Sequence, residues 1–229
     1  DGDLDLYVAN FKVNSVESIL TPSERRQAQI TEREGSNFIV RPEFKEHYRV
    51  ELRGDEHVLV EKAELDVLYI NDGAGRFKSF SVNTDRFVDD NGNNIEDLFD
   101  WGLQVRFQDF DNDGDPDIYV CNDYGSPDRM WRNDNQGFFQ PVDLKSVRHT
   151  SKFTMSADFS DLDRDGNVDF MLADMLARDY GRMLMQESPV DRWQEPRQIG
   201  RSDTRPQIKR NTVFLNRGDN TYAEIARLN

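Results

Sequence analysis

The chain has 229 residues, of which 36% are hydrophobic, and its 44 acidic against 29 basic residues give a formal net charge of -15. This composition supports a folded core and argues against nucleic acid as a partner, because nucleic-acid-binding proteins present basic surfaces. The single cysteine, Cys121, excludes an intrachain disulfide framework. No apolar run reaches the roughly 18 residues that would predict a transmembrane helix.

The first ten residues, DGDLDLYVAN, hold the second half of an acidic motif that is completed twice later in the chain. Asp1, Asp3 and Asp5 are therefore metal-ligand candidates. The acidic positions that would precede Asp1 in the motif are missing. The sequence leaves open whether this half-loop binds metal.

Residues 11–64 interrupt the repeat and are predicted to form a partly helical insertion. Thr21-Pro22-Ser23-Glu24 is typical of a capping box with proline at the first helical position, and Gly35 lies where such a helix would end. We therefore predict a largely solvent-facing helix from Thr21 to Gly35. Tyr48–Leu52 and His57–Val60 are predicted to pair as a hairpin. The Arg-Gly-Asp sequence between them is interpreted as turn chemistry, not as an adhesive motif.

Two stretches, DFDNDGDPDIYV from Asp109 and DLDRDGNVDFML from Asp161, share the pattern D-x-D-x-D-G-x-x-D followed by an apolar segment. Carboxylates this close repel each other unless a cation neutralises them, and Ca²⁺ accepts about six to eight oxygen ligands. Gly114 and Gly166 permit the sharp turn that such a loop needs. The predicted side-chain ligands are Asp109, Asp111, Asp113, Asp117, Asp161, Asp163, Asp165 and Asp169, and the predicted carbonyl ligands are Asp115 and Asn167.

The obvious alternative for these loops is an EF-hand, which requires a bidentate Glu at position 12 and a helix on each side. Position 12 is Val120 in one loop and Leu172 in the other, and the flanking residues favour strands. The sequence therefore indicates strand–loop–strand sites. The remaining alternative is an Asp-rich turn that is held by hydrogen bonds of its own side chains and binds no ion.

A second recurring mark is an aromatic residue, a short turn with Gly or Asn where positive φ is expected, and another aromatic. It occurs at 69–77, 131–139 and 214–222, and it is typical of hairpins. Together the marks predict four-stranded antiparallel units, as in propeller blades. The predicted strands are Leu103–Phe107, Asp117–Val120, Arg129–Arg132 and one from Phe138, then Thr154–Phe159, Asp169–Ala173, Thr212–Asn216 and Thr221–Ile225.

The spacing of the marks predicts about three blades in an all-β chain. They are residues 1–84 with an insertion at 11–64, residues 101–147, and residues 154–229 with an insertion at 175–211. The second insertion is expected to have little regular structure. It contains Trp193, a candidate for stacking on a sugar, whereas Trp131 is expected in the core.

No catalytic residue is assigned from the sequence. His47, His57 and His149 lie far apart, and no nucleophile or phosphate-binding motif accompanies them. An enzyme role is left open only as the propeller part of a secreted hydrolase or lyase whose catalytic residues lie outside this segment.

The metal loops, the strand after each and the N-D-x-x-G-x-F turns resemble FG-GAP/VCBS repeats, which form the β-propeller of integrin α subunits and of many secreted bacterial proteins. DWGLQVRFQDFDNDGDPDIYVCNDYGSPDRMW and RPQIKRNTVFLNRGDNTYAEIA are more similar still to bacterial proteins akin to cartilage acidic protein. The resemblance implies a seven-bladed propeller with Ca²⁺ in loops between strands one and two. Because three blades cannot close a propeller, we expect the chain to be part of a larger polypeptide or assembly.

These observations predict a calcium-binding, non-catalytic interaction module that is secreted, either extracellular or periplasmic. Its predicted cofactor is Ca²⁺, and its partner is an unidentified protein or polysaccharide. Calcium outside the cell is concentrated enough to fill even weak sites.

Overall fold

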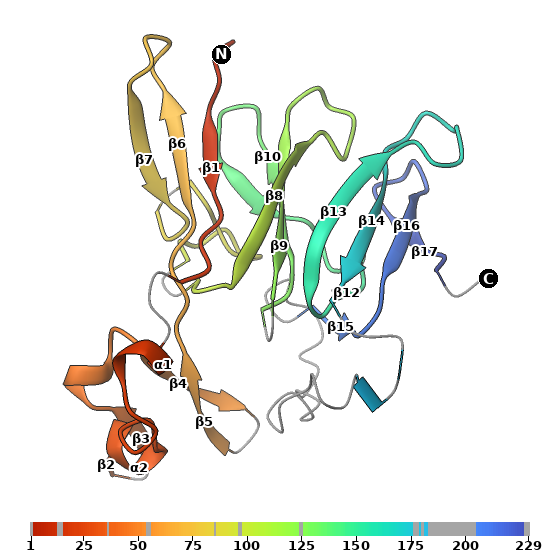
Figure 1. Ribbon diagram of the computed structural model, residues 1–229. Helices are drawn as coiled ribbons and strands as arrows, with labels where there is room; N and C mark the ends of the chain where they lie inside the picture. Colours follow the sequence, from red (N-terminus) through yellow and green to blue (C-terminus); the bar gives the residue numbers. More distant parts are fainter. Residues whose placement is uncertain are drawn as a thin grey trace. The chain divides into compact units, whose positions relative to one another are not determined.

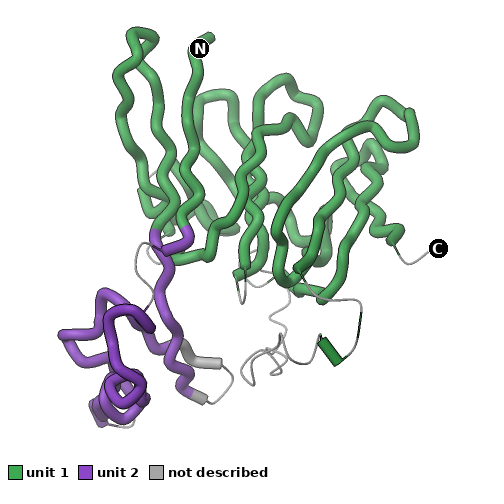
Figure 2. Tube along the Cα trace, in the orientation of Figure 1, with its two compact units in different colours: residues 1–10, 65–229 green, residues 11–64 purple. Residues whose placement is uncertain are grey.

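The computed structural model describes residues 2–12, 16–35, 37–53, 56–84, 86–95, 98–123, 126–175, 179, 181–182 and 205–226. The fold is all-β, and the described helices are single short turns, so the predicted fold class is confirmed. No helix in these ranges is long and apolar enough to span a membrane. The chain divides into two compact units, Asp1–Asn10 with Leu65–Asn229, and Phe11–Glu64 (Figure 2).

The larger unit contains three antiparallel sheets that follow one another along the chain (Figure 1). The first has the order β1 (Leu6–Val8), β6 (Val67–Asn71), β7 (Phe77–Ser81). The second is β8 (Gly102–Gln108), β9 (Asp117–Asn122), β10 (Arg129–Asn133), β11 (Phe139–Pro141). The third is β13 (Thr154–Ser160), β14 (Asp169–Asp174), β16 (Thr212–Asn216), β17 (Tyr222–Glu224).

The second and third sheets are structural repeats of each other. Each has four strands in meander order, and each carries a register shift at the start of its first strand, between Gly102 and Gln104 and between Thr154 and Ser156. The predicted strands agree with the observed ones to within one or two residues. Two four-stranded antiparallel sheets with matching irregularities are compatible with blades of an incomplete propeller.

The two faces of β9 are buried between different sheets, since successive side chains on a strand point in opposite directions. Ile118 and Val120 face the first sheet and are fully buried. Phe87 lies in the same cluster, stacked on Phe139 with ring centroids 5.0 Å apart and edge-on to Trp131 at 5.3 Å. The other buried members are Tyr7, Leu68, Val82 and Leu98. The predicted core position of Trp131 is therefore confirmed.

The opposite face of β9, with Tyr119 and Cys121, packs against the third sheet. Phe170 of β14 stacks on Phe214 of β16 in this cluster, with ring centroids 4.6 Å apart. The other buried members are Phe110, Met130, Val147, Ala157 and Leu172. Because every residue of β9 is buried, this strand forms the centre of the larger unit.

The smaller unit corrects the prediction of a helix from Thr21 to Gly35. Its elements are α1 (Val16–Ile19), α2 (Gln27–Ile30), β2 (Thr31–Glu34), β3 (Asn37–Val40), η1 (Pro42–Phe44), β4 (Tyr48–Arg53) and β5 (Glu56–Glu61). The capping contact does form, with the Thr21 N–H 2.8 Å from Glu24 Oε2, but it closes only one turn. Residues 31–34 pair instead with residues 37–40, which is a hairpin that the local capping signal cannot reveal.

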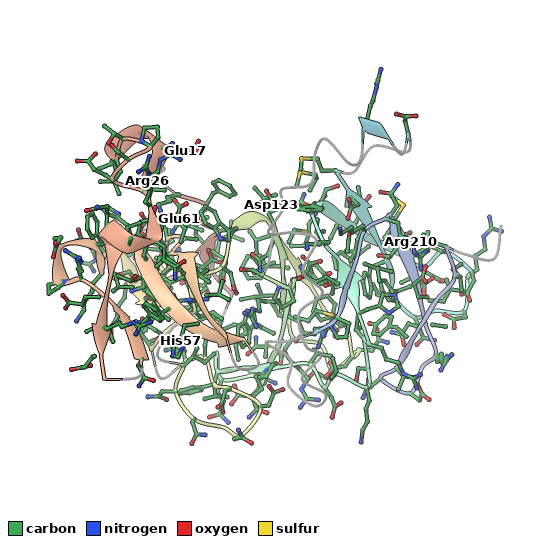
Figure 3. The ribbon with its side chains drawn as sticks, turned by 90° about the horizontal axis from the view of Figure 1, so that it is seen from below. Glu17, Arg26, His57, Glu61, Asp123 and Arg210 are labelled. Atoms are coloured by element: carbon green, nitrogen blue, oxygen red, sulfur yellow. The ribbon has the colours of Figure 1, made fainter. Side chains whose placement is uncertain are left out.

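The hairpin predicted around residues 53–56 is confirmed, because β4 pairs with β5 from Tyr48–Glu61 to Arg53–Glu56. Figure 3 labels His57 and Glu61 on β5. Glu61 pairs with Lys12 at 2.6 Å. The core of the smaller unit consists of Val16, Ile30, Val40 and Tyr48. Gly54 and Asp55 of the Arg-Gly-Asp sequence lie outside the described residues.

Most of the second predicted insertion, including Trp193, lies outside the described residues. Its end returns to the larger unit, where β15 (Gln207–Ile208) pairs in parallel with β12 (Thr150–Ser151). The side chain of Gln207 donates to the carbonyl of Ser126 at 3.0 Å. The prediction of little regular structure therefore misses one short strand.

Candidate metal centre

The loop from Asp109 to Asp117 connects β8 to β9 and is folded around the carboxylate of Asp109. Both oxygens of Asp109 accept backbone hydrogen bonds, from Asp113 N at 3.2 Å and from Gly114 N at 3.0 Å. Asn112 and Gly114 have φ of 60° and 98°, so the backbone turns twice through the left-handed region. The expected special backbone at Gly114 is present, and the turn at Asn112 adds to it.

Within this loop Asp109, Asp111 and Asp117 converge, with one carboxylate oxygen from each lying within 4.8 Å of the others. Oδ1 of Asp111 and Oδ2 of Asp115 are buried without a hydrogen-bond partner. Buried polar atoms are nearly always paired, so two orphaned oxygens in one acidic loop are unusual. This donor set contains only oxygen atoms, and it fits a hard divalent cation such as Ca²⁺.

The electrostatics of the loop favour the binding of a cation. Burial, followed by the neighbouring carboxylate of Asp113, raises the pKa of Asp111. The same two causes raise the pKa of Asp115. The Nε atom of Arg132 lies 3.9 Å from Asp111 Oδ2 and opposes the shift only in part. A cation among these oxygens would reverse the cost of holding them together.

Asp117 differs from the other two members, because both of its oxygens already accept backbone hydrogen bonds. Phe110 N donates to Oδ2 at 2.9 Å and Asn133 N donates to Oδ1 at 2.8 Å. Asp117 is fully buried, and burial raises its pKa to about 6. A carboxylate oxygen has a second lone pair, so these bonds leave room for a metal. They also give Asp117 a structural role that does not depend on metal.

The loop from Asp161 to Asp169 repeats this geometry between β13 and β14. Asp161, Asp163 and Asp169 offer oxygens within 4.8 Å of one another. Asp161 accepts from Asp165 N and Gly166 N at 3.0 and 3.1 Å, as Asp109 does in the first loop. Arg164 and Gly166 have φ of 65° and 89°, which matches Asn112 and Gly114.

The remaining predicted ligands lie outside the two carboxylate groups. Oδ1 of Asp113 accepts the N–H of Asp115 at 3.0 Å, and Oδ1 of Asp165 accepts the N–H of Asn167 at 2.8 Å. These are turns held by the side chain two residues earlier. The hydrogen bonds with Asn167 lower the pKa of Asp165. The carbonyl ligands predicted at Asp115 and Asn167 stay predictions.

The N-terminal half-loop reproduces the end of the motif. Oδ1 of Asp5 accepts the N–H of Asn71 at 2.8 Å, as Asp117 accepts that of Asn133. The carboxylate of Asp3 lies close to Gly73: a Cβ atom added at Gly73 would be 3.1 Å from Oδ2 of Asp3. Asp1 lies outside the described residues. Figure 1 shows the chain start, the β6–β7 hairpin and both complete loops at the same end of the larger unit.

Asn133, at the end of β10, connects its metal loop to the following hairpin, a role that the turn pattern did not predict. Besides its backbone bond to Asp117, its side-chain amide donates to the carbonyl of Pro116 at 3.2 Å, and its Oδ1 accepts the N–H of Gly137 at 3.2 Å. The equivalent backbone pairs are Asn71 with Asp5 and Asn216 with Asp169, at 2.8 Å each. The recurrence of Asn at this position was the signal in the sequence.

Asp128, immediately before β10, is a buried carboxylate that the sequence-predicted sites do not include. Its Oδ1 accepts the N–H of Asn122 at 2.9 Å, and its Oδ2 accepts the hydroxyls of Tyr119 at 2.7 Å and Thr154 at 2.8 Å. Burial raises the pKa of Asp128 to about 7, although these hydrogen bonds and Arg205 lower it. The carboxylate therefore anchors the end of β9 and bridges to β13.

A residue with the same hydrogen-bonding role lies at the equivalent position of each of the other two sheets. Asp66, before β6, accepts the N–H of Asn10 at 2.7 Å and the hydroxyl of Tyr7 at 2.9 Å. Burial raises its pKa to about 7. In the third sheet the position is occupied by Asn211, whose Oδ1 accepts the N–H of Asp174 at 2.7 Å. In the sequence this position could have been recognised as an acidic or amide residue that stands three residues before the first aromatic residue of each hairpin.

Replacing Asp128 with Asn is expected to change how stability depends on pH. The pKa of Asp128 is about 7 in the folded chain against about 4 when unfolded, so its contribution to stability is largest below pH 4 and falls as pH rises to about 7. The variant lacks this titration, and Asn211 shows that an amide can accept the same backbone bond. Between pH 5 and pH 8 the variant should gain about 2.5 kcal/mol relative to wild type.

Urea unfolding of both proteins at constant calcium measures this difference. Asp66 titrates in both proteins and cancels, while the groups that face position 128, Tyr119 and Arg205, are unchanged. Burial lowers the pKa of Arg205 only to about 10, so it stays charged over this range. A free-energy difference that is constant between pH 5 and pH 8 would contradict the shifted pKa.

Residues 109–172 match the family model of the FG-GAP-like repeat. The match begins at the first complete loop and ends in β14, after the second loop. It supports the FG-GAP β-propeller family that the motifs and the four-stranded sheets indicate. No curated protein and no solved structure matches the chain with significant similarity. The finer similarity to bacterial proteins akin to cartilage acidic protein stays a prediction.

Proposed function

We propose that this chain is a calcium-stabilised β-propeller segment that acts as a non-catalytic interaction module outside the cytoplasm. One observation supports the calcium sites above all others: in each of two loops, carboxylates converge within 4.8 Å. In the first of them a buried Asp111 oxygen has no hydrogen-bond partner. Without a cation that arrangement costs free energy through repulsion and desolvation.

The ion would be held by Asp109, Asp111 and Asp117 in one loop and by Asp161, Asp163 and Asp169 in the other. Each loop joins two adjacent antiparallel strands, so a bound ion would hold the end of β8 next to the start of β9, and the end of β13 next to the start of β14. Because the unfolded chain does not hold these oxygens together, the binding free energy would add to folding stability. The ion's role here is structural.

The interaction role rests on the architecture. Repeated sheets held rigid at one end by metal can present their loops as a binding surface, and loops on a rigid scaffold commonly carry recognition. A secreted location supplies calcium at concentrations that fill even weak sites. The proposed partner is a protein or a polysaccharide.

Calorimetric titration with CaCl₂ tests the metal sites. We expect the wild-type protein to bind one ion per complete loop and Asp111→Asn to lose about tenfold or more in affinity at one of them, because one ligand charge is removed. Asp143→Asn is the matched control, since Asp143 is exposed, lies outside both loops and only closes a local turn with Lys145. Identical titration curves for the two variants would refute the assignment.

A further inference from the structure

The first loop, between β8 and β9, and the second loop, between β13 and β14, differ in formal charge. The first contains five Asp and the second contains four, because position 7 of the motif is Asp115 in one and Asn167 in the other. Each loop also has one exposed arginine, Arg132 beside the first and Arg164 within the second, so basic residues do not distinguish them. The charge carried by the ligand groups is one of the properties that set the calcium affinity of such loops.

In the second loop, Asn167 occupies the carboxylate of Asp165. Its Nδ2 donates to Oδ2 of Asp165 at 2.9 Å, and its backbone N–H donates to Oδ1 at 2.8 Å. Oδ1 of Asn167 accepts from Nδ2 of Asn112 in the first loop at 3.5 Å, so the amide is contacted on both sides. Both oxygens of Asp165 therefore already accept hydrogen bonds, and a metal would have to share them with Asn167.

In the first loop, the equivalent carboxylate of Asp113 keeps one oxygen available. Its Oδ1 accepts the N–H of Asp115 at 3.0 Å, and among the described residues its Oδ2 accepts no hydrogen bond. Asp115 has no side-chain amide to donate, and its own Oδ2 is buried without a hydrogen-bond partner. Such an oxygen is costly to bury, and a cation in the loop would offset that cost. Asp in place of Asn at position 7 therefore leaves a ligand oxygen free and adds a negative charge.

The first loop is also the more enclosed of the two. Asp109 and Asp111 of its convergent carboxylates are partly buried, whereas the corresponding Asp161 and Asp163 of the second loop are exposed. Opposite charges attract more strongly where water is excluded, so partly buried carboxylates hold a cation more tightly than exposed ones. Burial and charge therefore both favour the first loop as the tighter site.

We propose that the two loops bind calcium with different affinities, and that position 7, Asp115 in the first loop and Asn167 in the second, sets the difference. The first loop stays filled when the calcium concentration falls, and the second empties first. Since the second loop leads into β14, its occupancy makes the start of the third sheet responsive to calcium. The inference rests on the proposed calcium sites and adds the order in which they fill.

Calorimetric titration of the calcium-free full chain with CaCl₂ tests this order. We expect two classes of site, one ion each, with dissociation constants at least about tenfold apart. Asp111→Asn should weaken only the tighter class and Asp163→Asn only the weaker one, which assigns each class to its loop. The reverse assignment, or two ions in a single class, overturns this inference and leaves the proposed calcium sites intact. No calcium binding at all refutes both.

Substitutions at position 7 test the role of that residue. Asp115→Asn should weaken the tighter class about tenfold, and Asn167→Asp should strengthen the weaker class by a similar factor. Both substitutions keep the size and shape of the side chain, and the second is a gain that a damaged fold cannot produce. Asp143→Asn and Gln140→Glu are the matched controls, since they make the same charge changes at exposed positions outside both loops. If the variants at position 7 titrate like these controls, Asp115 and Asn167 do not set the affinities.

Discussion

Chelation of calcium should lower the melting temperature of the larger unit by about 10–20 °C. An ion present at 100 times its dissociation constant stabilises the folded state by about 2.7 kcal/mol, so two occupied loops contribute about 5 kcal/mol. For a chain of this size each kcal/mol shifts the melting temperature by about 2–4 °C. Fluorescence of Trp131, buried between the first and second sheets, follows unfolding of this unit.

Two controls make the chelation experiment specific. Mg²⁺ at the same concentration should restore little stability, because it requires a near-ideal octahedral geometry and keeps its water ligands, whereas Ca²⁺ accepts a flexible set of oxygen ligands. Matched NaCl tests whether simple screening of the net charge is sufficient. The described residues of Phe11–Glu64 include no candidate loop, so a transition that reports this unit should not respond to calcium. An unchanged melting curve in EDTA would exclude a stabilising role for the loops.

The strands could be predicted because each signal is local and repeated. The apolar segments after Asp117 and Asp169 become the fully buried β9 and, in the third sheet, β14. The positive-φ turn positions at Gly137 and Gly218 have φ of 76° and 72°. The prediction of a helix in the smaller unit was wrong because strand pairing outweighed a local signal. Thr21 and Glu24 form their capping contact, but pairing between residues 31–34 and 37–40 overrides its continuation.

The candidate site could be located from the sequence, but the sequence could not show which of its Asp side chains converge. Spacing treats all the Asp positions alike, whereas the left-handed turns at Asn112 and Arg164 direct Asp113 and Asp165 toward local backbone N–H groups. The buried carboxylates of Asp66 and Asp128 were missed because their burial depends on packing between sheets. No periodicity within one strand reports that packing.

Phe170→Ala should destabilise the chain by about 3–5 kcal/mol, because it removes a fully buried ring and leaves a cavity. Phe170 is 1% exposed, stacks on Phe214 and meets Tyr222 edge-on with ring centroids 5.1 Å apart. A loss of that size is a large share of the roughly 5–15 kcal/mol that stabilises most domains. Chemical unfolding at saturating calcium measures it without a contribution from metal release.

The neighbouring residue provides the matched control for this substitution. Met171 follows Phe170 on β14, points to the opposite face of the third sheet and is 46% exposed. Met171→Ala should therefore cost less than about 1 kcal/mol. The contrast between adjacent positions isolates packing against the second sheet from any general weakening of β14. Equal losses at both positions would show that the two faces of β14 are packed alike, and the cluster between the second and third sheets would then not be the main source of stability.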